Sequence, residues 1–147
     1  MGREPRRFYD VTVYGGLDLR REITAVQDQK LGDTALLWDG KTLVGLAVCQ
    51  WGRNTEAGAD TCYVKFGTIR KGPGAVDFFE RLLSVCESLA AKRGMETVLA
   101  GVNTACHDAY HRMLDRGFRA DFQGVLMLKP NEPAFDVPDC YVMCDLR

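Results

Sequence analysis

Apolar runs and turn residues alternate through the middle of the chain in a pattern typical of antiparallel strands. Residues 34–38 and 43–51 are apolar runs, and they are joined by Asp39-Gly40, the strongest short-range signal for a hairpin. A polar, glycine-containing stretch separates them from residues 61–69, which read as the next strand. The pattern therefore predicts a meander of three antiparallel strands.

A turn, a long helix, a strand and a second helix follow this meander. After residues 70–74 the chain carries one apolar stripe at helical spacing up to Gly94, a typical helix stop. Residues 97–102 form a continuous apolar run, which predicts a strand buried on both faces. Residues 105–116 again follow helical spacing.

The two ends of the chain contribute further elements. Residues 7–14 predict a strand and residues 18–29 predict a helix. Residues 118–128 and 141–145 read as the last two strands, and residues 130–138 between them hold too much proline for a helix or a central strand. The whole pattern predicts an α+β domain, with a mixed, mostly antiparallel sheet flanked by helices.

Composition and charge narrow the class of protein. The 147 residues are enough for one domain with a sizeable core, and 46% hydrophobic with 27% charged residues is ordinary for a globular protein. A net charge of -1 gives no reason to expect a nucleic-acid or membrane partner. No segment approaches the roughly 20 apolar residues that a membrane helix needs.

The six cysteines and two histidines do not predict a metal site. No CxxC pair and no zinc spacing occurs, and most cysteines lie in apolar patterns; without an export signal, this indicates reduced thiols in the cytoplasm. His107, His111 and Asp115 share one helix face, a spacing that would suit a divalent metal. The apolar stripe of that helix lies elsewhere, so we expect this face to be solvated.

Two motifs resemble those of the GNAT acyltransferases. Residues 39–47 combine a tight turn with the sequence Leu-Val-Gly-Leu-Ala, as in the hairpin of that family. Residues 109–118 form an amphipathic helix that closes on Gly117-Phe118, as in the family's last motif. The resemblance covers residues 34–128. It implies a GNAT-like acyl-CoA acyltransferase fold for a single domain 1–147, with residues 1–33 as an atypical N-terminal strand and helix and residues 129–147 as a Pro-rich connection and last strand.

The resemblance also implies where acetyl-coenzyme A binds. In the family the strands that correspond to residues 61–69 and 97–102 splay apart, and the pantetheine arm pairs with the main chain of the first. Here this implies cofactor-binding roles for Phe66, Thr68 and Ile69. Glycine turns at helix starts suit a pyrophosphate. The resemblance gives this role to the residues that follow that strand, which are Arg70, Lys71, Gly72, Gly74 and Ala75. It also implies that Asn103 binds the cofactor.

The chain departs from the family pattern at two points. The turn is shorter than the family's loop, and Pro73 lacks an N–H group that would bind phosphate. Met113 stands where family members that use a general acid carry tyrosine. Tyr110, one helical turn earlier, is then the only plausible proton donor, and its alternative role is packing at the edge of the core.

Two GNAT-type functions remain open on these grounds, beside a small-ligand- or protein-binding α+β domain unrelated to GNAT. The first is an acetyl-CoA-dependent N-acetyltransferase that transfers an acetyl group to an unidentified amine acceptor, without a metal. The second is a catalytically silent GNAT-fold module that acts in packing or partner binding. Only about 20 residues separate the first two predicted strands, enough for one helix where the family has two. The thin N-terminal part is consistent with a homodimer or with an upstream GNAT domain as partner.

Overall fold

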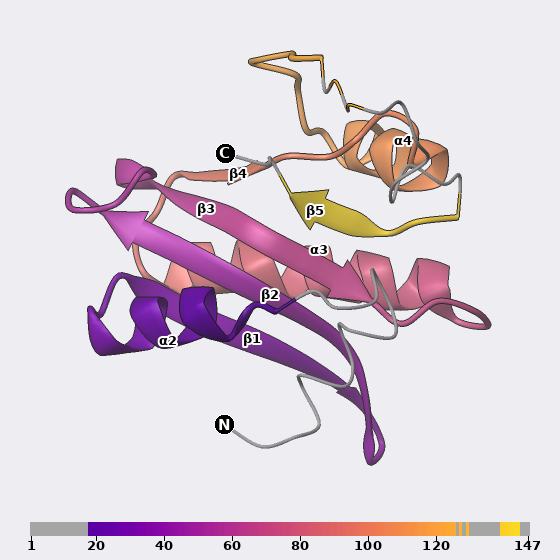
Figure 1. Cartoon of the computed structure of the whole chain (residues 1–147), viewed down its shortest axis with the longest axis horizontal. Helices are drawn as coiled ribbons and strands as arrows, with labels where there is room; N and C mark the ends of the chain where they lie inside the picture. Colours follow the sequence, from indigo (N-terminus) through magenta and orange to yellow (C-terminus); the bar gives the residue numbers. More distant parts are fainter. Residues whose placement is uncertain (1–17, 126, 128, 130–138, 145–147) are drawn as a thin grey trace.

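The computed structural model describes residues 18–125, 127, 129 and 139–144 (Figure 1). Within them, one five-stranded sheet is flanked by helices, so the predicted mixed α+β architecture is confirmed. The strand predicted over residues 7–14 and the Pro-rich stretch 130–138 lie outside the described residues.

Three antiparallel strands form the first part of the sheet, and they confirm the predicted meander. They are β1 (Gly32–Asp39), β2 (Thr42–Gly52) and β3 (Gly58–Ile69), paired in that order. The hairpin between β1 and β2 turns at Gly40, whose φ of 58° falls in the left-handed region that glycine adopts at no steric cost. Every residue from 43 to 50 on β2 is buried, so both faces of this strand are covered.

A parallel strand follows through a helical crossover. Helix α3 (Ala75–Lys92) leads from β3 into β4 (Thr97–Ala100), and it lies behind the strands in the view of Figure 1. The two strands pair in parallel over four residues, from Thr61 opposite Thr97 to Val64 opposite Ala100. Beyond Val64 the main chain of β3 has parted from β4. The two strands therefore splay over the second half of β3.

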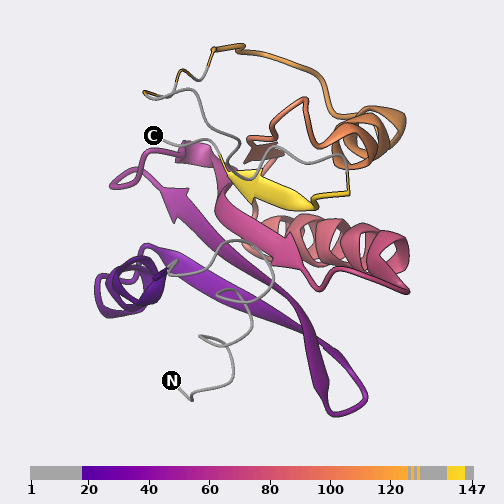
Figure 2. The same ribbon diagram turned by 45° about the vertical axis from the view of Figure 1, so that its right-hand side comes forward.

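The last strand fills the gap between the splayed strands. Helix α4 (His107–Asp115) follows β4, and the short strand β5 (Val142–Cys144) pairs antiparallel with the end of β3. Both views show β5 between β3 and α4 (Figures 1 and 2). Helix α2 (Arg20–Asp28) packs against β1 and β2 at the other end of the sheet.

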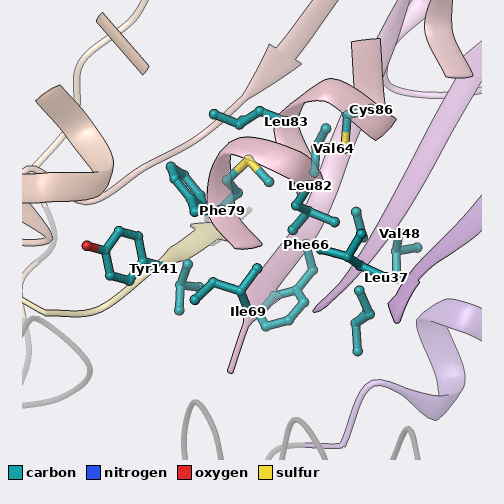
Figure 3. Close-up of a cluster of buried hydrophobic side chains, with 14 of the residues drawn as sticks. Leu37, Val48, Val64, Phe66, Ile69, Phe79, Leu82, Leu83, Cys86 and Tyr141 are labelled. Carbon is teal, nitrogen blue, oxygen red and sulfur yellow. The ribbon is translucent and has the colours of Figure 1, made fainter. Parts of the chain in front are cut away.

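The core forms where α3 meets the sheet (Figure 3). Burial on α3 recurs at the three- and four-residue spacing of one helical face, and it places Phe79, Leu82 and Cys86 against strand residues such as Val64 and Ile69. The sequence predicted this stripe from its spacing alone.

Two strand predictions are wrong. Residues 118–125 and 127 form no strand, and the side chains of Phe122, Val125 and Met127 are each more than four-fifths exposed. Alternation favours a strand only where a neighbouring edge supplies hydrogen bonds and burial, and within the described residues no strand pairs with this segment. Strand β4, predicted as buried on both faces, has two exposed and two partly buried residues.

The core placement predicts a large difference between two phenylalanines. Phe79 is fully buried, so Phe79→Ala should lower the free energy of unfolding by about 3–5 kcal/mol, because it leaves a cavity between α3 and the sheet. Phe122→Ala is the matched control and should change it by less than about 0.5 kcal/mol. Urea unfolding measures both, and similar losses in the two variants would contradict this core.

Candidate functional site

The turn between β3 and α3 has the backbone shape of an anion-binding loop. Gly72 and Gly74 adopt φ values of 104° and 84°, and Gly74 is the residue that precedes the first turn of α3. One donor of the turn is already used, because the Ala75 N–H bonds to the Gly72 carbonyl over 3.1 Å. Pro73 has no N–H at all. The turn therefore offers fewer donors to a phosphate than its glycine content suggests.

A cavity of about 590 Å³ opens beside this turn. Its walls come from the turn, from the first turns of α3 and from the segment that leads into β5: Gly72, Gly74, Ala75, Val76, Asp77, Glu80, Asp139 and Tyr141. The cavity thus brings together three of the residues predicted to hold pyrophosphate.

Acidic side chains dominate the charge around this cavity. Asp77, Glu80 and Asp139 line it, and the described lining residues include no basic one. Arginines offset two of these charges: Arg116 Nη1 lies 2.8 Å from Glu80 Oε2, and Arg81 Nη1 lies 3.8 Å from Asp77 Oδ2. A diphosphate in this cavity would meet no surplus of positive charge, which is unfavourable for an anion.

The two predicted basic residues lie outside the cavity lining. Arg70 turns back onto β2, where its Nε and Nη2 donate to the Leu43 carbonyl over 3.2 Å each. Lys71 is exposed. Arg70 therefore binds the start of the inner strand β2, and neither side chain adds to the lining of the cavity.

The strand residues predicted to hold the pantetheine are paired with the protein's own main chain. Phe66 lies opposite Cys144, and Thr68 lies opposite Val142, across the β3–β5 ladder. Ile69 is buried and pairs with Gly45 of β2. Along these residues, β5 takes the position of a neighbouring strand.

Strand β5 is also joined to the far side of the splay. The Cys144 N–H donates to the Gly101 carbonyl over 2.9 Å, and Met143 forms an isolated antiparallel bridge with Val102. On the near side the Thr68 hydroxyl donates to the Tyr141 carbonyl over 3.1 Å. The segment around β5 thus closes the splay from both edges.

The remaining predicted residues do not meet the cavity. The Asn103 side chain accepts a hydrogen bond from the Ala105 N–H over 2.9 Å and so shapes the turn before α4. Tyr110 is half-buried and packs on the ring of His111, with 5.5 Å between the ring centroids. Met113 is buried in the core. Tyr110, the predicted proton donor, is therefore not among the residues that line the cavity.

Sequence reasoning missed the polar contact that anchors the C-terminal segment. The Tyr141 hydroxyl donates to the Asp108 carboxylate at the start of α4, and the same carboxylate oxygen is 2.8 Å from Arg112 Nε. The hydrogen bond from Tyr141, and then that from Arg112, hold the pKa of Asp108 below its usual range. The spacing of Asp108 and Arg112 on one helix face was a visible signal, but nothing in the sequence pointed from Asp108 to Tyr141.

A second ionic contact fixes α4 against α3. Arg116 Nε lies 2.8 Å from Glu87 Oε1, and the guanidinium also reaches Glu80. The hydrogen bond from Arg116 lowers the pKa of Glu87. These polar contacts therefore add to the buried apolar side chains of α4 and β5, such as Met113 and Met143.

Comparison with known proteins bears on the fold alone. No family model matches the chain, and no curated protein matches it either. Among solved structures it is similar to the aminoglycoside N-acetyltransferase AAC(6')-Iy, solved in complex with CoA, with a TM-score of 0.52. The match covers 75% of this chain and 87% of that chain, at 10% sequence identity.

This chain has the GNAT fold. The resemblance seen in the sequence, and the fold that it implied, are therefore confirmed. Within the described part of the GNAT domain, no helix combines the length and apolar character needed to cross a membrane. The same residues contain no cluster of three or more side chains that would hold a metal ion.

The environment of Tyr141 predicts an alkaline titration. Burial, and then the hydrogen bond to Asp108, raise the pKa of this phenol to about 12. An unfolded tyrosine titrates near pH 10, so the stabilising contribution of Tyr141 should be complete below pH 10 and lost as pH rises through 12. The ultraviolet difference titration between wild type and Tyr141→Phe should show a midpoint near pH 12. A midpoint near pH 10 would mean that the phenol is solvated.

Proposed function

We propose that this chain is a GNAT-fold module that is catalytically silent as folded and that acts in packing or partner binding. One observation carries the proposal: β5 pairs with Phe66, Gly67 and Thr68, the main chain that the resemblance assigns to the pantetheine arm. Strand β5 and a pantetheine arm cannot pair with the same edge of β3 at the same time. Acetyl-coenzyme A therefore does not fit the domain in this conformation.

The surroundings of the turn support the same proposal. The cavity is lined by three carboxylates, and Pro73 removes a donor from its loop. Met113 occupies the position of the family's proton donor, and Tyr110 does not line the cavity. The carboxylates and Pro73 would weaken binding of the coenzyme. The absence of a proton donor beside the cavity would slow proton transfer to its thiolate.

The second candidate is an acetyl-CoA-dependent N-acetyltransferase acting on an amine. A specific observation favours it: Gly72, Gly74 and Ala75 still border an open cavity at the start of α3. The similar solved structure is an N-acetyltransferase bound to CoA. In this function Arg70 and Lys71 would turn toward the phosphates, Asn103 would contact the cofactor, and Tyr110 would donate the proton.

The partner in the first function would be a protein. Within residues 18–125, α2 is the helix that precedes the meander. The side chains of Leu36 and Trp38 on β1 are each 40% exposed. A second copy of the chain, or an upstream GNAT domain, would be suited to cover such a surface.

Titration of acetyl-CoA into the full chain separates the two functions. For a silent module we expect no heat and no thermal shift at millimolar acetyl-CoA, and no release of free thiol with a panel of amines. The contrary result would be a Kd below about 100 μM, roughly 5.5 kcal/mol of interaction. In that case Gly74→Val, which clashes with Phe78 at a positive φ, should abolish binding if the turn holds the phosphates.

A further inference from the structure

We propose that β5 is an autoinhibitory strand that competes with an extended acyl-coenzyme A chain for the edge of β3. The inference rests on the proposed function, because it names the cause of the silence. The domain would be silent through occupation of its own edge, and release of β5 would open that edge. Three features of the described residues support this inference. They are the shortness of β5, the space above Gly67 that Met143 fills (the seat), and the hydrogen bond from Tyr141 to Asp108 (the latch).

The first feature is the shortness of the ladder. Strand β5 contributes three residues, whereas β2 pairs with β3 along most of the length of both strands. A short ladder breaks at a smaller free-energy cost than a long one, because few main-chain bonds are lost and water replaces them. The edge of β3 itself remains supported from the other side by β2. Strand β5 can therefore leave without loss of the meander.

The second feature is a seat shaped for one side chain. Met143 is fully buried and lies opposite Gly67. A Cβ atom at Gly67 would lie 2.6 Å from Met143 Cε, so the missing side chain of Gly67 makes the room that Met143 occupies. Gly67 has no positive φ that would strain an alanine there. An added methyl group would displace the end of the Met143 side chain, which is the buried anchor of the docked strand.

The third feature is the latch between β5 and the helices. The Tyr141 hydroxyl donates to Asp108 of α4, and the Tyr141 ring packs on Phe79 of α3 with 5.3 Å between centroids (Figure 3). The Asp108 carboxylate is held in turn by Arg112. Tyr141 also lines the cavity beside the glycine turn. A ligand that entered at the turn would therefore meet the latch before it reached the edge of β3.

Competition of this kind has a simple quantitative consequence. When only the open fraction of a protein binds a ligand, the apparent Kd equals the intrinsic Kd divided by that fraction. A change that raises the open fraction tenfold therefore lowers the apparent Kd tenfold, provided that most molecules remain closed. Loosening of β5 should strengthen coenzyme binding, whereas loosening of an ordinary structural strand would leave it unchanged or weaken it.

The test uses two substitutions of β5 contacts in the full chain. Tyr141→Phe removes the latch hydrogen bond but keeps the ring on Phe79, and Gly67→Ala crowds Met143. Gly124→Ala is the matched control, because its new Cβ atom would meet only an ordinary contact, 3.6 Å from the ring of Phe122. Acetyl-CoA is titrated into each variant, and amide hydrogen exchange follows residues 66–68 and 142–144.

For an autoinhibitory strand, Tyr141→Phe and Gly67→Ala should each exchange faster at these amides and bind acetyl-CoA at least tenfold more tightly than wild type. Gly124→Ala should match wild type in both readouts. Faster amide exchange with no gain in affinity for acetyl-CoA would show that β5 does not compete with the coenzyme. Unchanged amide exchange in both variants would show that the Tyr141 hydrogen bond and the packing of Met143 on Gly67 do not hold β5 in place.

The wild-type titration tests the proposed function separately. Tight binding by wild type would refute a silent module, yet the ratio between variants and wild type would still report whether β5 competes. Absence of binding in wild type and in the opened variants would leave the module silent and overturn autoinhibition.

Discussion

The pairing of β5 with the end of β3 is the interaction on which the arrangement of this domain depends. Parallel pairing with β4 ends at Val64, while β3 continues to Ile69 through the buried part of the sheet. Unpaired N–H and C=O groups in such a place are costly, at about 1–3 kcal/mol each. The splay therefore has to be filled by something that extends like a strand. Residues of the protein's own C-terminal segment fill it.

Two halves of the domain are held together by different forces. The meander, α2 and α3 share an apolar core in which the side chains of Phe79, Leu82 and Leu83 are fully buried. Around β5 and α4, polar contacts add to this core: the Tyr141–Asp108 hydrogen bond and the ion pairs of Arg116. Directional contacts fix an orientation but contribute less stability than core burial, because each exchanges for hydrogen bonds with water. Around β5 the polar contacts therefore fix the orientation, while Val142 and Met143 also bury their side chains in the core.

The sequence predicted those parts of the fold that depend on local periodicity. The hairpin at Gly40 follows from two apolar runs joined by a turn signal, and the helices α3 and α4 follow from apolar residues at helical spacing; each lies where the pattern placed it. The strand predicted over residues 118–128 is wrong for the described part of that range, because a local sequence pattern does not show whether a partner edge exists. Tyr141 was missed because its partner Asp108 is 33 residues away. The glycine turn was visible in the sequence, whereas the carboxylates around it converge only in three dimensions.

A binding site that consists of main-chain groups can be blocked without any change in the residues that form it. Phe66, Gly67 and Thr68 would offer the same N–H and C=O groups to a coenzyme as to β5, so their identities do not reveal which of the two they bind. A substitution is visible in the sequence, as the resemblance implies for Met113, whereas occupation of the strand edge changes no residue of the occupied strand. The signs of occupation lie instead in β5 and the residue before it: Met143 fits the space above Gly67, and the Tyr141 hydroxyl bonds to Asp108. Under the proposed autoinhibition, the conformation of residues 139–144 would therefore decide coenzyme binding more than the composition of the loop does.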